Sequence, residues 1–182
     1  MEYFEIINRY LQFDSQVYRK YIFHCTAVTK KSVQIAKTLK LSKKEITFIE
    51  EAAMLHDIGI CSVDMGNNKI GIPYICHGIV GEQILAKEGL IKHSLVARNH
   101  IGVGLTAKQI KKKRFPLPVI DMKPQTIHQE IITYSDLFFS KGNLFLTRTS
   151  SQVRNKIGKY GTDVLKTFED WHKKFKVNGE GL

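Results

Sequence analysis

The sequence has few acidic residues, prolines and cysteines, and each shortage excludes a class of protein. Its 182 residues include 4 prolines, and 17 Asp and Glu stand against 28 Lys and Arg, a formal net charge of +11. Its 3 cysteines show no Cys-x-x-Cys spacing, so we expect reduced thiols, not a disulfide framework or a zinc ribbon. No apolar run approaches the roughly 20 residues of a membrane span, and the first residues lack the pattern of a signal peptide. We therefore expect a cytoplasmic protein without membrane association.

What the sequence does contain is helical patterning almost throughout. Ser42 with Glu45, and a Thr-x-x-Gln pattern at both Thr106 and Thr126, are capping-box signals that begin helices. We find no convincing alternating pattern of a strand, and residues 60–73 and 115–124 carry the Gly, Asn and Pro of loops. We expect helices over residues 2–11, 16–39, 46–56, 74–88, 91–100, 127–139, 153–160 and 164–175.

The length and the absence of a linker favour one domain. A chain that is 43% hydrophobic can bury one sizeable core, although 182 residues slightly exceed the usual domain of about 100–150 residues. No internal repeat or low-complexity tract divides it. We therefore predict an all-α protein with a single domain over residues 1–182.

Histidines and aspartates occur along the chain in an order that indicates a metal site. Each of the histidines stands among apolar residues, and any one of them alone is best explained as a hydrogen-bonded core histidine. The aspartates change this interpretation, because a buried carboxylate is costly unless a cation pairs with it. Together, imidazole and carboxylate suit Mn, Fe, Co, Ni or Zn. The candidate ligands are His24, His56, Asp57, His77, His100 and Asp136.

The pattern His24, His56-Asp57-Ile58-Gly59, Asp136 resembles the HD superfamily of metal-dependent phosphohydrolases over about residues 20–140. The resemblance implies an HD-domain helical bundle with a core over residues 20–140, additional N- and C-terminal helices, and the C-terminal ones, at 150–178, packed on that core. It also implies that these histidines and aspartates hold one metal ion. His77 and His100 match the extra histidines of the branches with two metals, in which Asp57 would bridge both ions.

The sequence departs from the family pattern in two places. Many HD enzymes follow the motif with a lysine that contacts phosphate, whereas Ile60 and Cys61 stand here, and we assign that catalytic role to Lys69 in the next loop. The branch that hydrolyses cyclic dinucleotides has a GYP motif and two adjacent histidines, while here Ile101 follows His100. Hydrolysis of cyclic dinucleotides is therefore disfavoured.

A basic run over residues 108–114 is the candidate for binding substrate. Lys108, Lys111 and Arg114 could hold phosphates by charge and hydrogen bonds, and the alternative is a solvated helix face. His93 lies two turns before His100, and we expect it at the surface, with a place beside the site as the alternative.

These observations predict an HD-type metal-dependent phosphohydrolase. It would cleave a small phosphate ester or nucleotide with metal-activated water, using two divalent ions drawn from Mn, Fe, Co, Ni, Zn or Mg. The alternatives are a di-iron oxygenase on the HD scaffold, similar to myo-inositol oxygenase, and a regulatory metal-binding module without turnover. Nucleic acid is the less favoured partner, because the basic residues are not interleaved with exposed aromatics. The substrate, the acid for the leaving group and the oligomeric state stay open.

Overall fold

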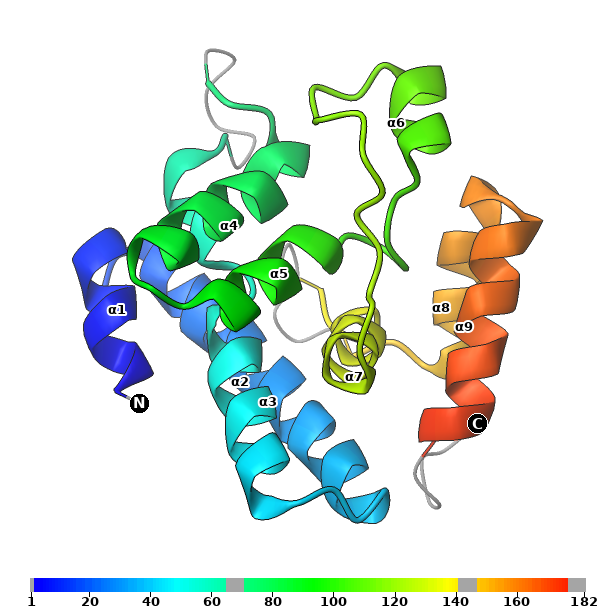
Figure 1. Ribbon diagram of the computed structural model, residues 1–182, viewed down its shortest axis with the longest axis horizontal. Coiled ribbons are helices and arrows are strands. Elements are labelled where there is room, and N and C mark those ends of the chain that lie inside the picture. Colours follow the sequence, from blue (N-terminus) through cyan, green and yellow to red (C-terminus); the bar gives the residue numbers. More distant parts are fainter. Residues whose placement is uncertain (1, 65–70, 141–146, 177–182) are drawn as a thin grey trace.

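The computed structural model describes residues 2–64, 71–140 and 147–176. Over these ranges the chain folds into helices joined by turns, with isolated β-bridges and no strand, which confirms the all-α prediction. None of the described helices has the length and hydropathy needed to cross a membrane. In chain order the elements (Figure 1) are α1 (Tyr3–Tyr10), α2 (Gln16–Thr38), α3 (Lys43–Leu55), η1 (Ile58–Ser62), η2 (Tyr74–Cys76), α4 (His77–Lys87), α5 (Ile91–Asn99), α6 (Ala107–Lys113), α7 (Ile127–Asp136), α8 (Ser150–Ile157), η3 (Gly158–Tyr160) and α9 (Thr162–Phe175), where η marks a short 3-10 helix.

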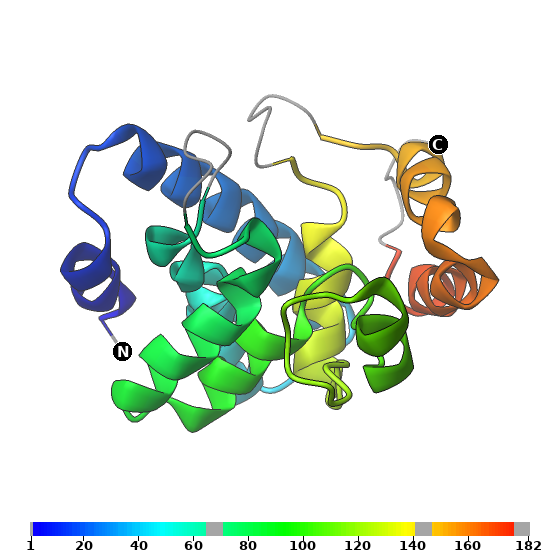
Figure 2. The same ribbon diagram turned by 90° about the horizontal axis from the view of Figure 1, so that it is seen from above.

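The long helix α2 is central to the packing. It lies against α3 and α7, while α5 contacts α3, α4 and α7, and η1 rests on α4. Helices α8 and α9 pack on each other, and α9 also contacts α7. Seen from above, α1 lies at one end of the molecule and the pair α8 and α9 at the other (Figure 2). Residues from α2, α3, α5 and α7 therefore meet in the middle.

Two clusters of buried apolar side chains support this arrangement. The larger cluster joins α2, α3 and α7 to the C-terminal helices, where Phe168, Trp171 and Phe175 are buried. The second lies under α1 and includes Ile7, together with Leu55 at the end of α3. Burying such side chains is the main favourable contribution to folding, at roughly 25 cal/mol per Å² of apolar surface. Helices α2, α3 and α5 contribute to both clusters, and each of them carries a candidate ligand or ends directly before one.

Local capping explains where several helices begin. Ser42 and Thr106 each form the predicted capping box, and an unpredicted box at Thr149 begins α8 at Ser150, ahead of the expected residue 153. At Thr126 only one bond of the predicted capping box forms, in which the backbone N–H of Gln129 donates to the Thr126 hydroxyl. The Gln129 side chain accepts instead from the backbone N–H of Gln125 and from the Asn99 amide.

Two further predicted boundaries are wrong. Helix α7 ends at Asp136, not at residue 139, because Phe138 and Phe139 donate to carbonyls three residues earlier and turn the chain. The predicted loop over residues 60–73 begins later, since Ile58–Ser62 form η1.

Candidate metal centre

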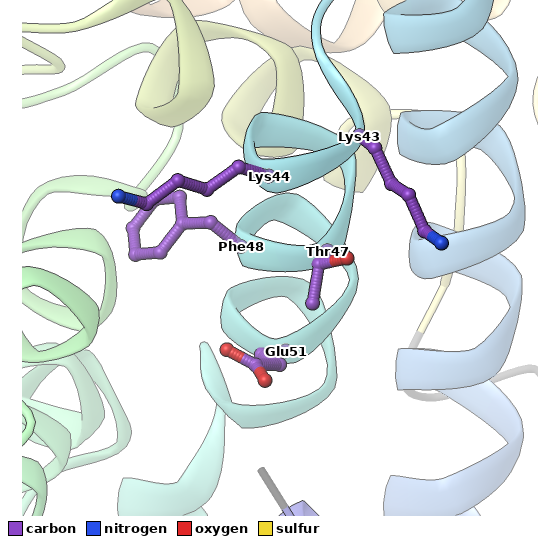
Figure 3. A pocket seen from close by; sticks show the side chains of 5 residues that line it. All are labelled: Lys43, Lys44, Thr47, Phe48 and Glu51. Carbon is purple, nitrogen blue, oxygen red and sulfur yellow. The ribbon is translucent and has the colours of Figure 1, made fainter.

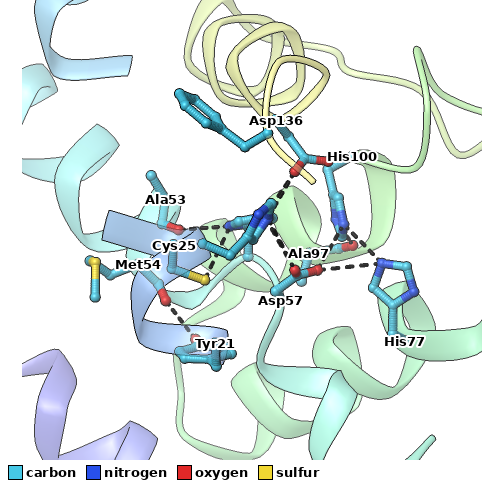
Figure 4. A network of polar contacts seen from close by, with 12 residues as sticks. Tyr21, Cys25, Ala53, Met54, Asp57, His77, Ala97, His100 and Asp136 are labelled. Carbon is cyan, nitrogen blue, oxygen red and sulfur yellow. Dashed lines mark hydrogen bonds and ion pairs between the residues drawn. The ribbon is translucent and has the colours of Figure 1, made fainter. Parts of the chain in front are cut away.

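All six candidate ligands come together at the junction of five helices. Five of them are buried, with at most 3% of the residue exposed, and Asp136 is partly exposed. Figure 4 shows Asp57, His77, His100 and Asp136 pointing toward one another. The six residues are His24 in α2, His56 and Asp57 directly after α3, His77 at the start of α4, His100 directly after α5, and Asp136 at the end of α7.

The carboxylate of Asp57 lies at the centre of the cluster. Its Oδ2 atom is 3.4 Å from Nε2 of His24 and 3.7 Å from Nε2 of His56. Its Oδ1 atom is 3.4 Å from Nε2 of His77 and 3.3 Å from Nε2 of His100. Each oxygen therefore faces a different pair of histidines, and one carboxylate connects the two pairs.

Asp136 adds a second carboxylate, which lies beside the pair His24 and His56 and also has an oxygen within 4.8 Å of a ligand atom of His100. Its Oδ1 atom lies 2.9 Å from Nε2 of His24 and 3.8 Å from Nε2 of His56. Because its side chain is 15% exposed, it also reaches the wall of a cavity. One side of the cluster thus has two histidines and two carboxylates.

Backbone carbonyls orient three of the imidazole rings. The Nδ1 atoms of His56, His77 and His100 each lie 2.7 Å from the carbonyl oxygen of the residue three positions earlier. A carbonyl can only accept, so Nδ1 donates, and in the neutral ring Nε2 presents a lone pair to the cluster. Metal-binding histidines are commonly fixed in this way. The sequence signal for these bonds is the position of each histidine at a helix end. The sequence analysis did not predict the bonds.

The unsatisfied nitrogen atoms test whether the cluster fits a cation. His56 Nε2 is buried and has no hydrogen-bond partner among the described residues. The Nε2 atoms of His77 and His100 are 3.0 Å apart, so their lone pairs face each other. The His and Asp residues form three overlapping groups, and within each group the ligand atoms lie within 4.8 Å of one another. The cluster therefore has the donor set and the unmet demand for positive charge that a divalent metal satisfies.

The pKa of His56 shows the same attraction for positive charge. Burial by itself lowers this pKa, but Asp57 and Cys25 outweigh the burial and raise the pKa well above 6.5. A proton thus occupies His56 readily when no metal competes, and metal binding must release it.

A cavity of about 940 Å³ opens onto this cluster at His77, His100 and Asp136. Lys113 is the residue of the predicted basic run that lines it, while Lys108, Lys111 and Arg114 are exposed and do not. The substrate role of those three residues stays a prediction. Lys69 lies outside the described residues.

The sequence analysis missed three cationic residues in the cavity wall. They are Lys20, Arg148 and Lys156. Lys20 could have been found, since it precedes His24 by four residues and shares its helix face. The other two follow the region of family resemblance, and only the packing of the C-terminal helices brings them here.

A separate hollow lies on the surface of α3 (Figure 3). Its lining contains none of the clustered histidines or aspartates, so it is not part of the candidate metal centre. The lining residues are Lys43, Lys44, Thr47, Phe48 and Glu51.

No model of a protein family matches the sequence. The uncharacterized protein MJ0778 of Methanocaldococcus jannaschii is 29% identical over 140 residues, which cover 75% of this chain and 76% of that protein. A tRNA (cytidine(56)-2'-O)-methyltransferase of Picrophilus torridus is 28% identical over 137 residues. This match covers 74% of the chain but only 36% of the methyltransferase, so the chain spans about a third of that relative.

The fold is similar to that of a solved domain. The crystal structure of the HD domain of the phosphodiesterase PgpH from L. monocytogenes superimposes with a TM-score of 0.52 at 18% identity. The match covers 84% of this chain and 89% of that domain. The chain therefore has the fold of an HD domain.

Proposed function

We propose that the protein is a metal-dependent phosphohydrolase that cleaves a small phosphate ester or a nucleotide. The observation that carries this proposal is the position of Asp57, whose two oxygens face two pairs of histidines beside a cavity large enough for a metabolite. The similarity in fold to the HD domain of a phosphodiesterase supports it.

The proposal assigns the six residues to two cation positions. His24, His56, Asp57 and Asp136 would hold one divalent ion, and His77 and His100 would hold a second together with Asp57. When bound, the ions would polarise a phosphoryl oxygen and lower the pKa of a coordinated water toward neutrality. Asp57 would contribute to both positions, because each of its oxygens faces one pair of histidines.

The chain's own residues keep these ligands in place. The bonds from Nδ1 to backbone carbonyls prevent the rings of His56, His77 and His100 from rotating away. His77, His100 and Asp136 meet both the cluster and the cavity, so the substrate would approach the ligands from the side where these three residues lie. Lys69 remains our proposed phosphate contact. Asp64, five residues earlier in the chain, lines the same cavity.

The test is an assay of metal-loaded protein against simple phosphate esters. Protein loaded with Mn²⁺ without oxygen should hydrolyse p-nitrophenyl phosphate, its bis-ester, or members of a nucleotide panel, and EDTA should abolish this activity. Oxygen uptake and a visible iron absorption without hydrolysis would identify the oxygenase alternative. Stoichiometric metal with neither activity would identify a regulatory module and overturn the proposal.

A further inference from the structure

We infer that the cavity contains a second anion-binding subsite, formed by Lys20, Lys113 and Lys156, and that the preferred substrate is a phosphate ester carrying a second phosphate group. The inference rests on the proposed function, because the first phosphate is the one that meets the metal ligands. It names the substrate class, which the metal centre alone leaves open.

The balance of charge in the cavity wall is the first argument. Among the described lining residues the cationic side chains are Lys20, Lys113, Arg148 and Lys156, against the carboxylates of Asp64 and Asp136. One of these carboxylates belongs to the cluster of ligands, where bound divalent ions would outweigh it. A phosphate monoester carries only about −1.5 to −2 at pH 7. A concave wall with this excess of positive charge concentrates ligands of higher negative charge.

The place of the lysines is the second argument. The Lys113 ammonium lies 4.9 Å from the centre of the Tyr160 ring and 5.9 Å from that of Phe115, and both rings line the cavity. Contacts of this kind hold a cation at a ring face. Lys156 precedes Tyr160 by four residues in the continuous run of α8 and η3. These two lysines therefore belong to one wall, made by α6 and the C-terminal helices.

This wall is separate from the elements that supply the metal ligands. Figures 1 and 2 both place α6 beside the C-terminal helices, with α4 on the far side of α6. Neither α6 nor α8 contributes a candidate ligand. Lys20 lines the cavity from α2, one helical turn before the candidate ligand His24.

Arg148 has a structural task and is left out of the subsite. Its Nη1 atom donates to the carbonyls of Phe139 at 2.8 Å and Leu137 at 3.4 Å, and so joins the start of the C-terminal segment to the end of α7. The cavity also has apolar lining, including Val103, Ile157 and Val164. At about 940 Å³ it is near the upper end of the roughly 300–1,000 Å³ of small-molecule sites, so it accommodates an organic group between two phosphates.

The test compares pairs of ligands that differ by one phosphate. AMP against adenosine 3′,5′-bisphosphate, and glucose 6-phosphate against glucose 1,6-bisphosphate, are titrated into the full chain by calorimetry. The titrations are made in EDTA, where no metal-dependent turnover occurs. At least one bisphosphate should bind about tenfold or more tightly than its monophosphate, since a charge-assisted hydrogen bond contributes about 1.5–3 kcal/mol.

Matched variants separate the subsite from general charge. Without metal ions the lysines are the anion site that remains for both ligands, so the double variant K113Q/K156Q should lose the preference for the bisphosphate and lose less affinity for the monophosphate. The control K112Q/K159Q removes the same charge from neighbouring exposed residues that do not line the cavity, and it should keep the preference. All four lysines are exposed, so the fold should survive, which circular dichroism checks.

The outcomes distinguish this inference from the proposed function. A lysine-dependent preference in EDTA, without hydrolysis by Mn²⁺-loaded protein, would support the subsite and overturn the phosphohydrolase. Hydrolysis of monoesters with equal affinity for both members of each pair would support the phosphohydrolase and overturn the subsite. An equal loss of affinity in the two double variants would also overturn the subsite.

Discussion

The Nε2 atoms of His77 and His100 lie 3.0 Å apart, although 23 residues separate the two histidines. Each ring donates from Nδ1 to a carbonyl, so both Nε2 atoms bring lone pairs into this short contact. Two acceptors at this distance repel each other unless positive charge lies beside them. Asp57 Oδ1 lies at similar distances from both, which makes three ligand atoms around one position.

This contact predicts that the two pairs of histidines serve different ions. His100→Ala should weaken the ion held by His77 and Asp57, while the ion on the side of His24 persists. Losing a residue that only hydrogen-bonds to a metal ligand typically lowers metal affinity roughly 10–100-fold. Losing the ligand itself should lower the affinity by at least as much. Native mass spectrometry counts the ions, and His24→Ala should show the reverse selectivity. His128→Ala, a histidine outside the cluster, is the control. Equal loss of both ions in each variant would contradict separate positions.

Asp57→Ala should remove both ions, because both oxygens of this carboxylate face the cluster. If the proposed function holds, the rate of hydrolysis should fall on the order of a thousandfold or more. Metal ions stabilise the transition state by several kcal/mol, and a loss of that size lowers the rate by such a factor. Metal analysis and the phosphate-ester assay measure these effects, with circular dichroism as the check of folding. Asp163→Asn, an exposed aspartate in the first turn of α9, should change neither. An Asp57→Ala protein with its full metal content would overturn the bridging role.

Most helices could be predicted because their signals are local. The capping boxes at Ser42 and Thr106 involve residues three positions apart, and the structure contains both. The end of α7 could not be predicted in this way. Leu137 and Phe138 continue the apolar run of the helix, but they are buried against other elements after the chain has turned.

The cluster itself was predictable from residue order, while its surroundings were not. The six candidate ligands were identified from their apolar setting and from the resemblance to a family. The basic run was treated as one unit, yet successive residues of a helix point about 100° apart. In the structure Lys113 therefore reaches the cavity and Lys111 does not. Lys156 depends on how α8 packs, which no local pattern encodes.

His93 predicts acid sensitivity that does not involve the candidate metal centre. The residue is buried, not at the surface as expected, with its ring 4.8 Å from that of Phe48 and Nε2 3.4 Å from Oε2 of Glu51. Burial lowers its pKa below 6.5 although Glu51 opposes this shift. The unfolded chain therefore binds the proton more readily. The stability linked to His93 is complete above pH 6.5 and is lost as the pH falls below that value.

Urea unfolding in EDTA at pH 7 and about pH 5 measures this effect. The free energy of unfolding should fall less on acidification for His93→Gln than for the wild type. Other titrating groups, including the clustered histidines, are shared by both proteins and cancel in the comparison. The same decrease in both would show that His93 does not contribute.

Gly59 predicts a steric requirement beside the cluster, in the turn that carries Asp57. A Cβ atom at this position would lie 2.0 Å from the carbonyl oxygen of His77 and 2.5 Å from the backbone nitrogen of Gly81. Both are backbone atoms of α4, so relief requires η1 to move away from α4. Gly59→Ala should therefore destabilise the protein by about 3 kcal/mol and weaken metal binding, because it displaces Asp57 relative to His77.

Gly158→Ala is the matched control, since its backbone is helical and no atom lies within 4 Å of the added Cβ. It should be neutral or stabilising by up to about 1 kcal/mol, the gain expected from restricting the unfolded chain. Urea midpoints and metal titrations of the two variants provide the comparison, and equal stability would show that η1 does not depend on this close approach to α4.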